Sequence, residues 1–125
     1  MFEEKILYKE LSYKIVGLAM QVHTELGFGF MEEVYQNALM VLLKENKIDS
    51  VARFPVKVHF HNHLVGDYIA DILVDNRILM VIKAYENLSG LHRAQTLNYL
   101  KATGLKLAIL LNFGKSKLEY ERLIL

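Results

Sequence analysis

The sequence predicts an α/β fold in which two N-terminal helices precede a central mixed sheet. Apolar residues recur at helical spacings of three and four up to about residue 46, and the period changes to two from Ser50. A further helical segment interrupts the strand pattern between residues 90 and 103. Short turns make the first three strands antiparallel, whereas the later helix permits a parallel crossover into the fourth strand. The expected order is therefore two helices, three strands, one helix and two strands.

Composition limits the classes of protein that this chain can represent. With 125 residues, 53% hydrophobic, it is expected to form one compact domain over residues 1–125. The net charge of +1 excludes a general basic field, so nucleic-acid binding would need a local patch. The absence of cysteine excludes disulfides and cysteine metal sites. Without a signal-peptide pattern or a run of about eighteen apolar residues, we expect a cytoplasmic protein with no membrane partner.

The first two elements are expected to be helices. Residues 3–26 form an amphipathic pattern that ends at Gly27-Phe28-Gly29. A second helix is expected over residues 30–46. In that helix Glu32 and Tyr35 lie about one turn apart and share one side.

Three strands are expected next, over residues 51–60, 64–74 and 78–84. Pro55 lacks a backbone N–H, which favours an edge strand or a strand start. His61-Asn62-His63 is expected to form the first turn. Alternating histidines in this region have a zinc-binding alternative, but a hairpin tip without a neighbouring carboxylate or cysteine favours a plain turn.

The last elements are a helix and two strands. Ser89 is the expected N-cap of a helix over residues 90–103, which ends at Gly104. Residues 106–113 are almost entirely apolar, which suits a strand inside a sheet. A turn at Gly114-Lys115 then leads into a final strand that ends at Leu125.

Asp71 and Lys83 are charged residues inside otherwise apolar strands. Burying a charge costs free energy unless the charge is paired, so such residues indicate either a site or a structural ion pair. A two-residue turn at Asp75-Asn76 would place the two charges on opposite faces, whereas a three-residue loop over residues 75–77 places them on one face. We expect the three-residue loop, because the other face then carries only apolar residues: Ala70, Ile72, Val74, Ile78, Met80 and Ile82.

The helix after these strands carries a polar stripe. His92, Gln95 and Tyr99 are spaced by three and four residues, so they share one side of the helix and can face the charged end of the sheet. Taken alone, the pattern equally describes a surface glutamine and a half-buried tyrosine.

Several short motifs together resemble the GxxExxY proteins, which belong to the PD-(D/E)XK nuclease superfamily. They are Val22-His23-x-x-Leu26-Gly27-x-Gly29, Gly29-x-x-Glu32-x-x-Tyr35, Ala70-Asp71, Lys83-Ala84, Gln95-x-x-Asn98-Tyr99-Leu100 and Leu111-Asn112-Phe113-Gly114. The resemblance covers nearly the whole chain in order. It implies a restriction-endonuclease-like αβββαβ core with a central mixed sheet, which agrees with the expected order of elements.

The resemblance also implies hydrolysis of nucleic-acid phosphodiesters, DNA above all, with Mg²⁺ or Mn²⁺. It assigns the metal to Asp71 and to Glu32, which resembles the helical acid of some superfamily members. Lys83 would orient or activate the attacking water. Gln95 and Tyr99 would line the catalytic centre. Together with His92, on the same helix stripe, these two residues are the expected contacts with nucleic acid.

One position departs from the family pattern. The expected Glu-x-Lys is Val81-Ile82-Lys83 here, and valine can neither bind a metal nor accept a proton. The sequence therefore predicts a nucleic-acid-associated protein whose Mg²⁺-dependent activity is weak or lost. Two alternatives stay open: an active nuclease that uses Glu32 or Glu86 as the replacement acid, and a non-catalytic interaction module that forms a homodimer.

Overall fold

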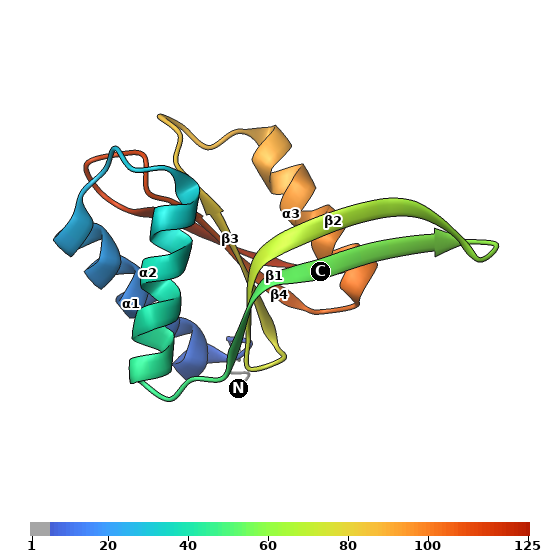
Figure 1. The fold of residues 1–125 in the computed structure, drawn as a ribbon, viewed down its shortest axis with the longest axis horizontal. Coiled ribbons are helices and arrows are strands. Elements are labelled where there is room, and N and C mark those ends of the chain that lie inside the picture. Colours follow the sequence, from blue (N-terminus) through green and yellow to red (C-terminus); the bar gives the residue numbers. More distant parts are fainter. Residues whose placement is uncertain (1–5) are drawn as a thin grey trace, which may run out of the picture.

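The computed structural model describes residues 6–125, which form an α/β fold of three helices and a five-stranded mixed sheet (Figure 1). The elements in chain order are α1 (Lys9–Leu26), α2 (Glu32–Glu45), β1 (Ser50–Phe60), β2 (His63–Val74), β3 (Ile78–Lys83), α3 (Gly90–Thr103), β4 (Leu107–Asn112) and β5 (Glu119–Ile124). The predicted order is confirmed, and most boundaries agree within one or two residues. The first helix begins at Lys9, so the prediction is wrong for residues 6–8, where the N-cap Tyr8 has a left-handed φ of 51°. The part of the prediction over residues 3–5 lies outside the described residues.

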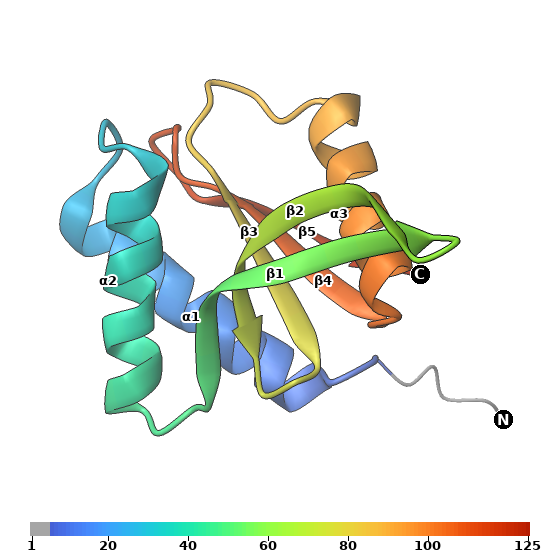
Figure 2. The same cartoon turned by 45° about the vertical axis from the view of Figure 1, so that its right-hand side comes forward.

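The strands lie in the sheet in the order of the sequence, from β1 to β5. β3 and β4 are parallel, and the other neighbouring pairs are antiparallel. Figure 2 shows α1 and α2 on one side of the sheet and α3, which connects β3 to β4, on the other. The edge position expected from Pro55 is confirmed, because among the strands of residues 6–125 β1 pairs only with β2. No helix within residues 6–125 is long and apolar enough to cross a membrane.

The register of the β2–β3 hairpin is the one expected from the charge pattern. Val74 pairs with Ile78, so residues 75–77 form a three-residue loop. Asp75 and Asn76 both have positive φ angles, of 51° and 54°, and the Arg77 N–H donates to the Val74 carbonyl at 3.0 Å. The two conformations suit Asp and Asn, whose short polar side chains tolerate left-handed backbone.

Both faces of the sheet are buried, which corrects the expectation of one apolar face and one charged face. Ile72, Val74, Ile78, Met80 and Ile82 share one apolar face, as predicted, and this face packs against α1 and α2. The opposite face forms a second apolar cluster under α3, because that helix shields it from water. The members of the second cluster are Val56, Ala70, Leu73, Leu79, Val81, Tyr99, Leu100, Ala108 and Leu110.

Ala70 belongs to the α3-side cluster and not, as predicted, to the face that carries Ile72. Strict alternation along β2 therefore breaks between these two residues, at Asp71. On the neighbouring strand, Arg53 lies between the paired residues Ala52 and Phe54 and has a left-handed φ of 55°. Beyond this irregularity, the side chains of β2 no longer lie on the faces of the sheet that strict alternation predicts. It also marks the point where β1 and β2 leave the main sheet.

Beyond this point β1 and β2 continue as a two-stranded arm, which projects from the rest of the molecule in Figure 1. Within the described residues, β3 pairs with β2 only over residues 72–74, whereas β1 pairs with β2 out to Phe60 and His63. The outer part of the arm exposes Phe60, Leu64 and Val65. The turn expected at His61-Asn62-His63 is confirmed for His61 and Asn62, which form the tip, whereas His63 is already the first residue of β2 and pairs with Phe60.

The backbone at Gly114 passes close to the backbone of Tyr85, and this close approach can be tested by substitution. A Cβ atom at Gly114 would overlap the backbone of Tyr85, whereas Gly17, exposed on α1, has open space around it. We expect Gly114→Ala to lower the free energy of unfolding by about 3 kcal/mol, because a backbone contact cannot yield like a flexible side chain. The matched control Gly17→Ala should raise it by about 0.5–1 kcal/mol. Urea unfolding measures both, and equal stabilities for the two variants would contradict the close approach.

Candidate active site

Asp71 occupies the point where β2 and β3 separate. The last paired residues of these strands are Ile72 and Met80, and beyond them the Ile82 N–H donates to Asp71 Oδ2 at 2.7 Å. The side chain of Asp71 thus replaces a backbone carbonyl as the partner of the strand. A backbone N–H left unpaired in a buried strand is costly, so the carboxylate is fixed by the fold itself.

The electrostatics of Asp71 bring three predicted site residues together. Burial raises the pKa of the Asp71 carboxyl above its ordinary value of 3.8, while the hydrogen bond from Ile82 opposes that rise. The charge of Glu32 raises this pKa further, and the charges of Lys83 and Arg53 lower it. Two acids and two bases from α2, β1, β2 and β3 therefore lie close enough to influence one ionisation.

Tyr99 of α3 lies in the same apolar cluster as Val81, close enough to Asp71 for the charge of that carboxylate to act on it. Burial raises the pKa of its phenol, and the negative charge of Asp71 adds to the effect. Its ring lies 5.9 Å from that of Tyr68 on β2. Gln95 lies one turn earlier on α3 and is partly exposed.

Two predicted residues lie elsewhere. His92 caps the start of α3: its Nδ1 accepts the Ser89 N–H at 3.1 Å, and its ring lies 4.6 Å from that of Tyr85. Ser89 is the N-cap residue, as expected. Glu86 is exposed in the loop between β3 and α3, and within residues 6–125 it is not among the charges that shift the pKa of Asp71.

Val81 is buried where the family pattern expects an acid. Asp71 and Val81 are the next residues on their strands after the Ile72–Met80 pair. The Val81 side chain is 1% exposed, pairs across the parallel ladder with Leu110, and belongs to the apolar cluster under α3. This position is therefore part of the hydrophobic core.

The donor set restricts which metal centre can form here. Within residues 6–125 no group of three or more His, Cys, Asp or Glu side chains is arranged to hold a metal ion. Asp71 and Glu32 supply two carboxylates, and one oxygen of Asp71 already accepts a hydrogen bond. Mg²⁺ accepts one or two protein carboxylates when waters or phosphate oxygens complete its shell. The residues fit a weak, open site of this kind and do not fit a closed cage.

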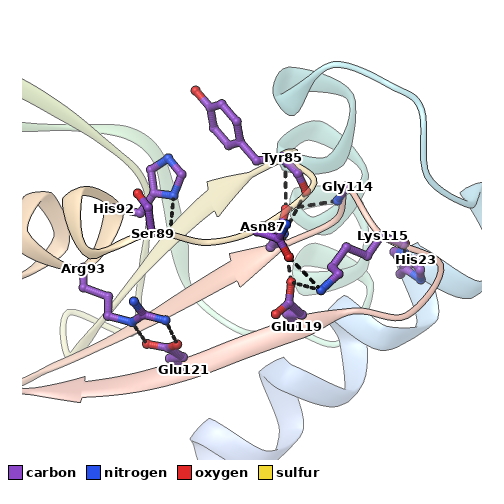
Figure 3. A network of polar contacts seen from close by, with 11 residues as sticks. His23, Tyr85, Asn87, Ser89, His92, Arg93, Gly114, Lys115, Glu119 and Glu121 are labelled. Carbon is purple, nitrogen blue, oxygen red and sulfur yellow. Dashed lines mark hydrogen bonds and ion pairs between the residues drawn. The ribbon is translucent and has the colours of Figure 1, made fainter.

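Asn112 is a positioning residue, which the sequence placed in the motif Leu111-Asn112-Phe113-Gly114 without a role. Its buried side-chain amide accepts the N–H groups of Tyr85 and Gly114, and it donates to the Tyr85 carbonyl and to Glu119. Figure 3 shows Tyr85, Gly114 and Glu119, the residues that this amide joins. The Phe113 N–H also donates to the Lys83 carbonyl at 2.8 Å. These bonds fix the end of β3; the sequence signal was one polar residue in an apolar strand.

Tyr35 has a similar scaffold role beside Glu32. Its hydroxyl donates to the Gly27 carbonyl at 2.7 Å and accepts the Phe30 N–H at 3.2 Å. Its ring stacks on that of Phe113 at 4.5 Å. The loop between α1 and α2 is thereby tied to the end of β4, which sets the first turn of α2 and the position of Glu32.

Arg53 is a residue that sequence reasoning missed. It lies opposite Asp71 across the β1–β2 pair, and its exposed side chain adds a positive charge to the site. Sparsely populated backbone conformations occur often at functional sites. No pattern in the sequence indicates a left-handed arginine in mid-strand, so only the structure reveals it.

The chain belongs to the PD-(D/E)XK nuclease superfamily, since a sequence model of that superfamily matches residues 9–123. The crystal structure of the protein SSO0001 has a similar fold, with a TM-score of 0.58 and 18% sequence identity. The match covers 74% of this chain and 50% of SSO0001, so the chain spans about half the length of that protein. No curated protein matches the chain significantly.

The raised pKa of Asp71 predicts how stability depends on pH. The pKa of Asp71 is 3.8 in the unfolded chain and higher in the folded protein, so between these two pKa values the native state binds more protons than the unfolded state. The stability of the fold therefore falls as pH rises through this window. Asp71→Asn keeps an oxygen for the Ile82 N–H and removes the buried charge. We expect this variant to be more stable than the unchanged protein at pH 7, with the difference disappearing below pH 3.8. Urea unfolding at both ends of the window measures it; a variant less stable at pH 7 would contradict the cost of burial.

Proposed function

We propose that this chain is a GxxExxY-type protein of the PD-(D/E)XK superfamily that binds nucleic acid, DNA in particular, and whose Mg²⁺-dependent phosphodiesterase activity is weak or lost. The observation that carries the proposal is Val81. Its side chain is buried in the apolar cluster under α3, whereas the acid and the lysine of the family pattern, Asp71 and Lys83, are present. The scaffold that positions the remaining charges supports a retained binding role.

The remaining residues suggest a division of roles. Asp71 and Glu32 would hold Mg²⁺ or Mn²⁺, and the bound ion would polarise a phosphoryl oxygen and acidify water. Lys83 provides an ammonium at the end of β3 that can pair with a phosphate oxygen. Arg53 provides a second cation on the other side of Asp71. The pairing of phosphates with such cations is sensitive to salt.

The residues on α3 complete the proposed contact surface. Tyr99 is close enough to Asp71 for the two ionisations to interact, and Gln95 lies one turn before it on the same helix. His92 packs against Tyr85 at the start of the helix. We assign Gln95 and Tyr99 to the lining of the phosphate site, and His92 to its outer border.

Restoring the missing carboxylate tests the proposal. Val81→Glu should be less stable than the unchanged protein without metal, because a carboxylate then enters an apolar cluster beside Asp71. Mn²⁺ should raise the unfolding temperature of Val81→Glu and allow it to cleave DNA. The matched control Val81→Gln has the same shape but no charge, and it should respond to neither Mn²⁺ nor Mg²⁺. Thermal unfolding with and without metal, followed by plasmid cleavage, measures these effects.

An active enzyme is the second candidate, and the influence of Glu32 on the ionisation of Asp71 favours it. In that case the unchanged protein would cleave DNA with Mg²⁺ or Mn²⁺, and Asp71→Ala, Lys83→Ala and Glu32→Gln would each abolish cleavage. Glu86→Gln serves as the matched control, since Glu86 is exposed outside the charged group. This pattern would replace the proposal of a weakened centre with that of an active nuclease.

A homodimeric interaction module is the third candidate, and the exposed arm favours it. Phe60, Leu64 and Val65 present apolar surface on a two-stranded arm, and such surface is typical of partner contacts. A dimer through this arm should dissociate in Leu64→Lys. Sedimentation equilibrium at micromolar concentration measures this, with DNA present or absent. A monomer at all concentrations would exclude the dimer, and a dimer unaffected by DNA or salt would count against the nucleic-acid proposal.

A further inference from the structure

A surface pocket of about 550 Å³ adjoins the candidate active site. Its lining residues come from the loop before α2, the first turn of α2 and the segment directly after β3: Phe30, Met31, Glu32, Glu33, Ala84 and Tyr85. Glu32 belongs both to this pocket and to the group of charges around Asp71. A ligand in the pocket would therefore be continuous with one bound at Lys83, which directly precedes Ala84 in the chain.

Tyr85 forms one aromatic part of the pocket, and its position is fixed. The side-chain amide of Asn112 binds both its N–H and its carbonyl, each at 2.9 Å. The ring packs at 4.6 Å from that of His92 and remains 48% exposed. Figure 3 shows the ring directed away from the polar network beneath it. Its backbone is thus held by the fold while its ring stays available to a ligand.

Phe30 forms the other aromatic part. Its N–H donates to the Tyr35 hydroxyl, and its ring meets that of Tyr35 edge-on at 6.2 Å. The side chain is nevertheless 48% exposed. Two anchored aromatic rings that the hydrophobic core does not bury provide ready surfaces for a flat ligand, because little conformational freedom is lost when the ligand stacks on them.

We propose that this pocket receives an unpaired nucleobase of a nucleic acid whose phosphate lies at Lys83, so that single-stranded or locally unpaired nucleic acid is the preferred ligand. Aromatic rings stack on the π-face of any base. The carboxylates of Glu32 and Glu33 can accept hydrogen bonds from base amino groups, and they repel phosphates. The base is therefore drawn to the pocket and the phosphate to the lysine. This inference rests on the nucleic-acid binding proposed above.

The preference for single strands follows from which faces of the bases are accessible. In a duplex the faces of the bases are covered by their neighbours, so Phe30 and Tyr85 could not stack on them without unpairing. A single strand exposes these faces and pays no such cost. The pocket thus favours single strands over duplexes, whereas the cations at Asp71 contact phosphates of both forms.

Fluorescence anisotropy with labelled DNA tests the inference. The probes are a short single strand, the same strand with abasic residues, and its duplex. We expect Tyr85→Ala and Phe30→Ala to weaken single-strand binding by roughly 5- to 100-fold and to leave duplex and abasic binding unchanged. Tyr85→Phe should bind like the unchanged protein, because stacking is retained. Tyr13→Ala is the matched control, since Tyr13 is an 81% exposed aromatic residue on α1 outside the pocket.

Each other outcome rejects a specific statement. If Lys83→Ala weakens all probes while Tyr85→Ala and Phe30→Ala bind single strands normally, the nucleic-acid proposal stands and the base pocket is rejected. Equal affinity of the unchanged protein for single strand, abasic strand and duplex also rejects the pocket. If no probe binds at low salt, both proposals are rejected. Thermal unfolding shows whether each variant is folded; should Tyr85→Ala unfold, Phe30→Ala and the abasic probe on the unchanged protein decide.

Discussion

The hydrogen bond between the Ile82 N–H and the Asp71 carboxylate is the interaction on which the site depends. Because of this bond, β2 can separate from β3 without leaving the backbone N–H of Ile82 unpaired. β2 is then free to continue with β1 into the projecting arm, and the gap between the strands holds an acid beside Lys83. The hydrogen bond at the point where β2 and β3 separate therefore also positions the carboxylate of Asp71.

The opposite side of the gap is held by side chains that take no part in the proposed chemistry. Asn112 binds the segment after Lys83, and Tyr35 binds the loop before Glu32. The stack of Tyr35 on Phe113 links these two supports. Glu32 and Lys83 therefore come from rigidly connected elements, although α2 and β3 are far apart in the sequence. Such support suits the phosphate site proposed above, because small displacements weaken charged contacts.

The sequence predicted much of this arrangement, for identifiable reasons. The periodicity of apolar residues was sufficient to predict the order of helices and strands. The apolar residues between positions 72 and 82 were sufficient to predict the register of the β2–β3 hairpin. Alternation failed at Ala70, because an irregular pair at Arg53 and Asp71 changes the face of the strand. Long-range hydrogen bonds such as those of Asn112 have no local pattern. Asn112 stood in a motif of the family resemblance, but its hydrogen-bond partners, like the position of Arg53, could be identified only once distant segments were placed together.

The buried valine at position 81 also changes the charge balance of the centre. Around Asp71, the structure brings together two acids, Asp71 and Glu32, and two bases, Lys83 and Arg53, so the formal charges cancel when all four are ionised. A third carboxylate would leave the group negative, and a polyanion would then need a bound cation before it could approach. With Val81 the centre is formally neutral. In the proposed function, a nucleic-acid strand would therefore contact Lys83 and Arg53 without a bound metal, so that binding would not share the metal requirement of hydrolysis.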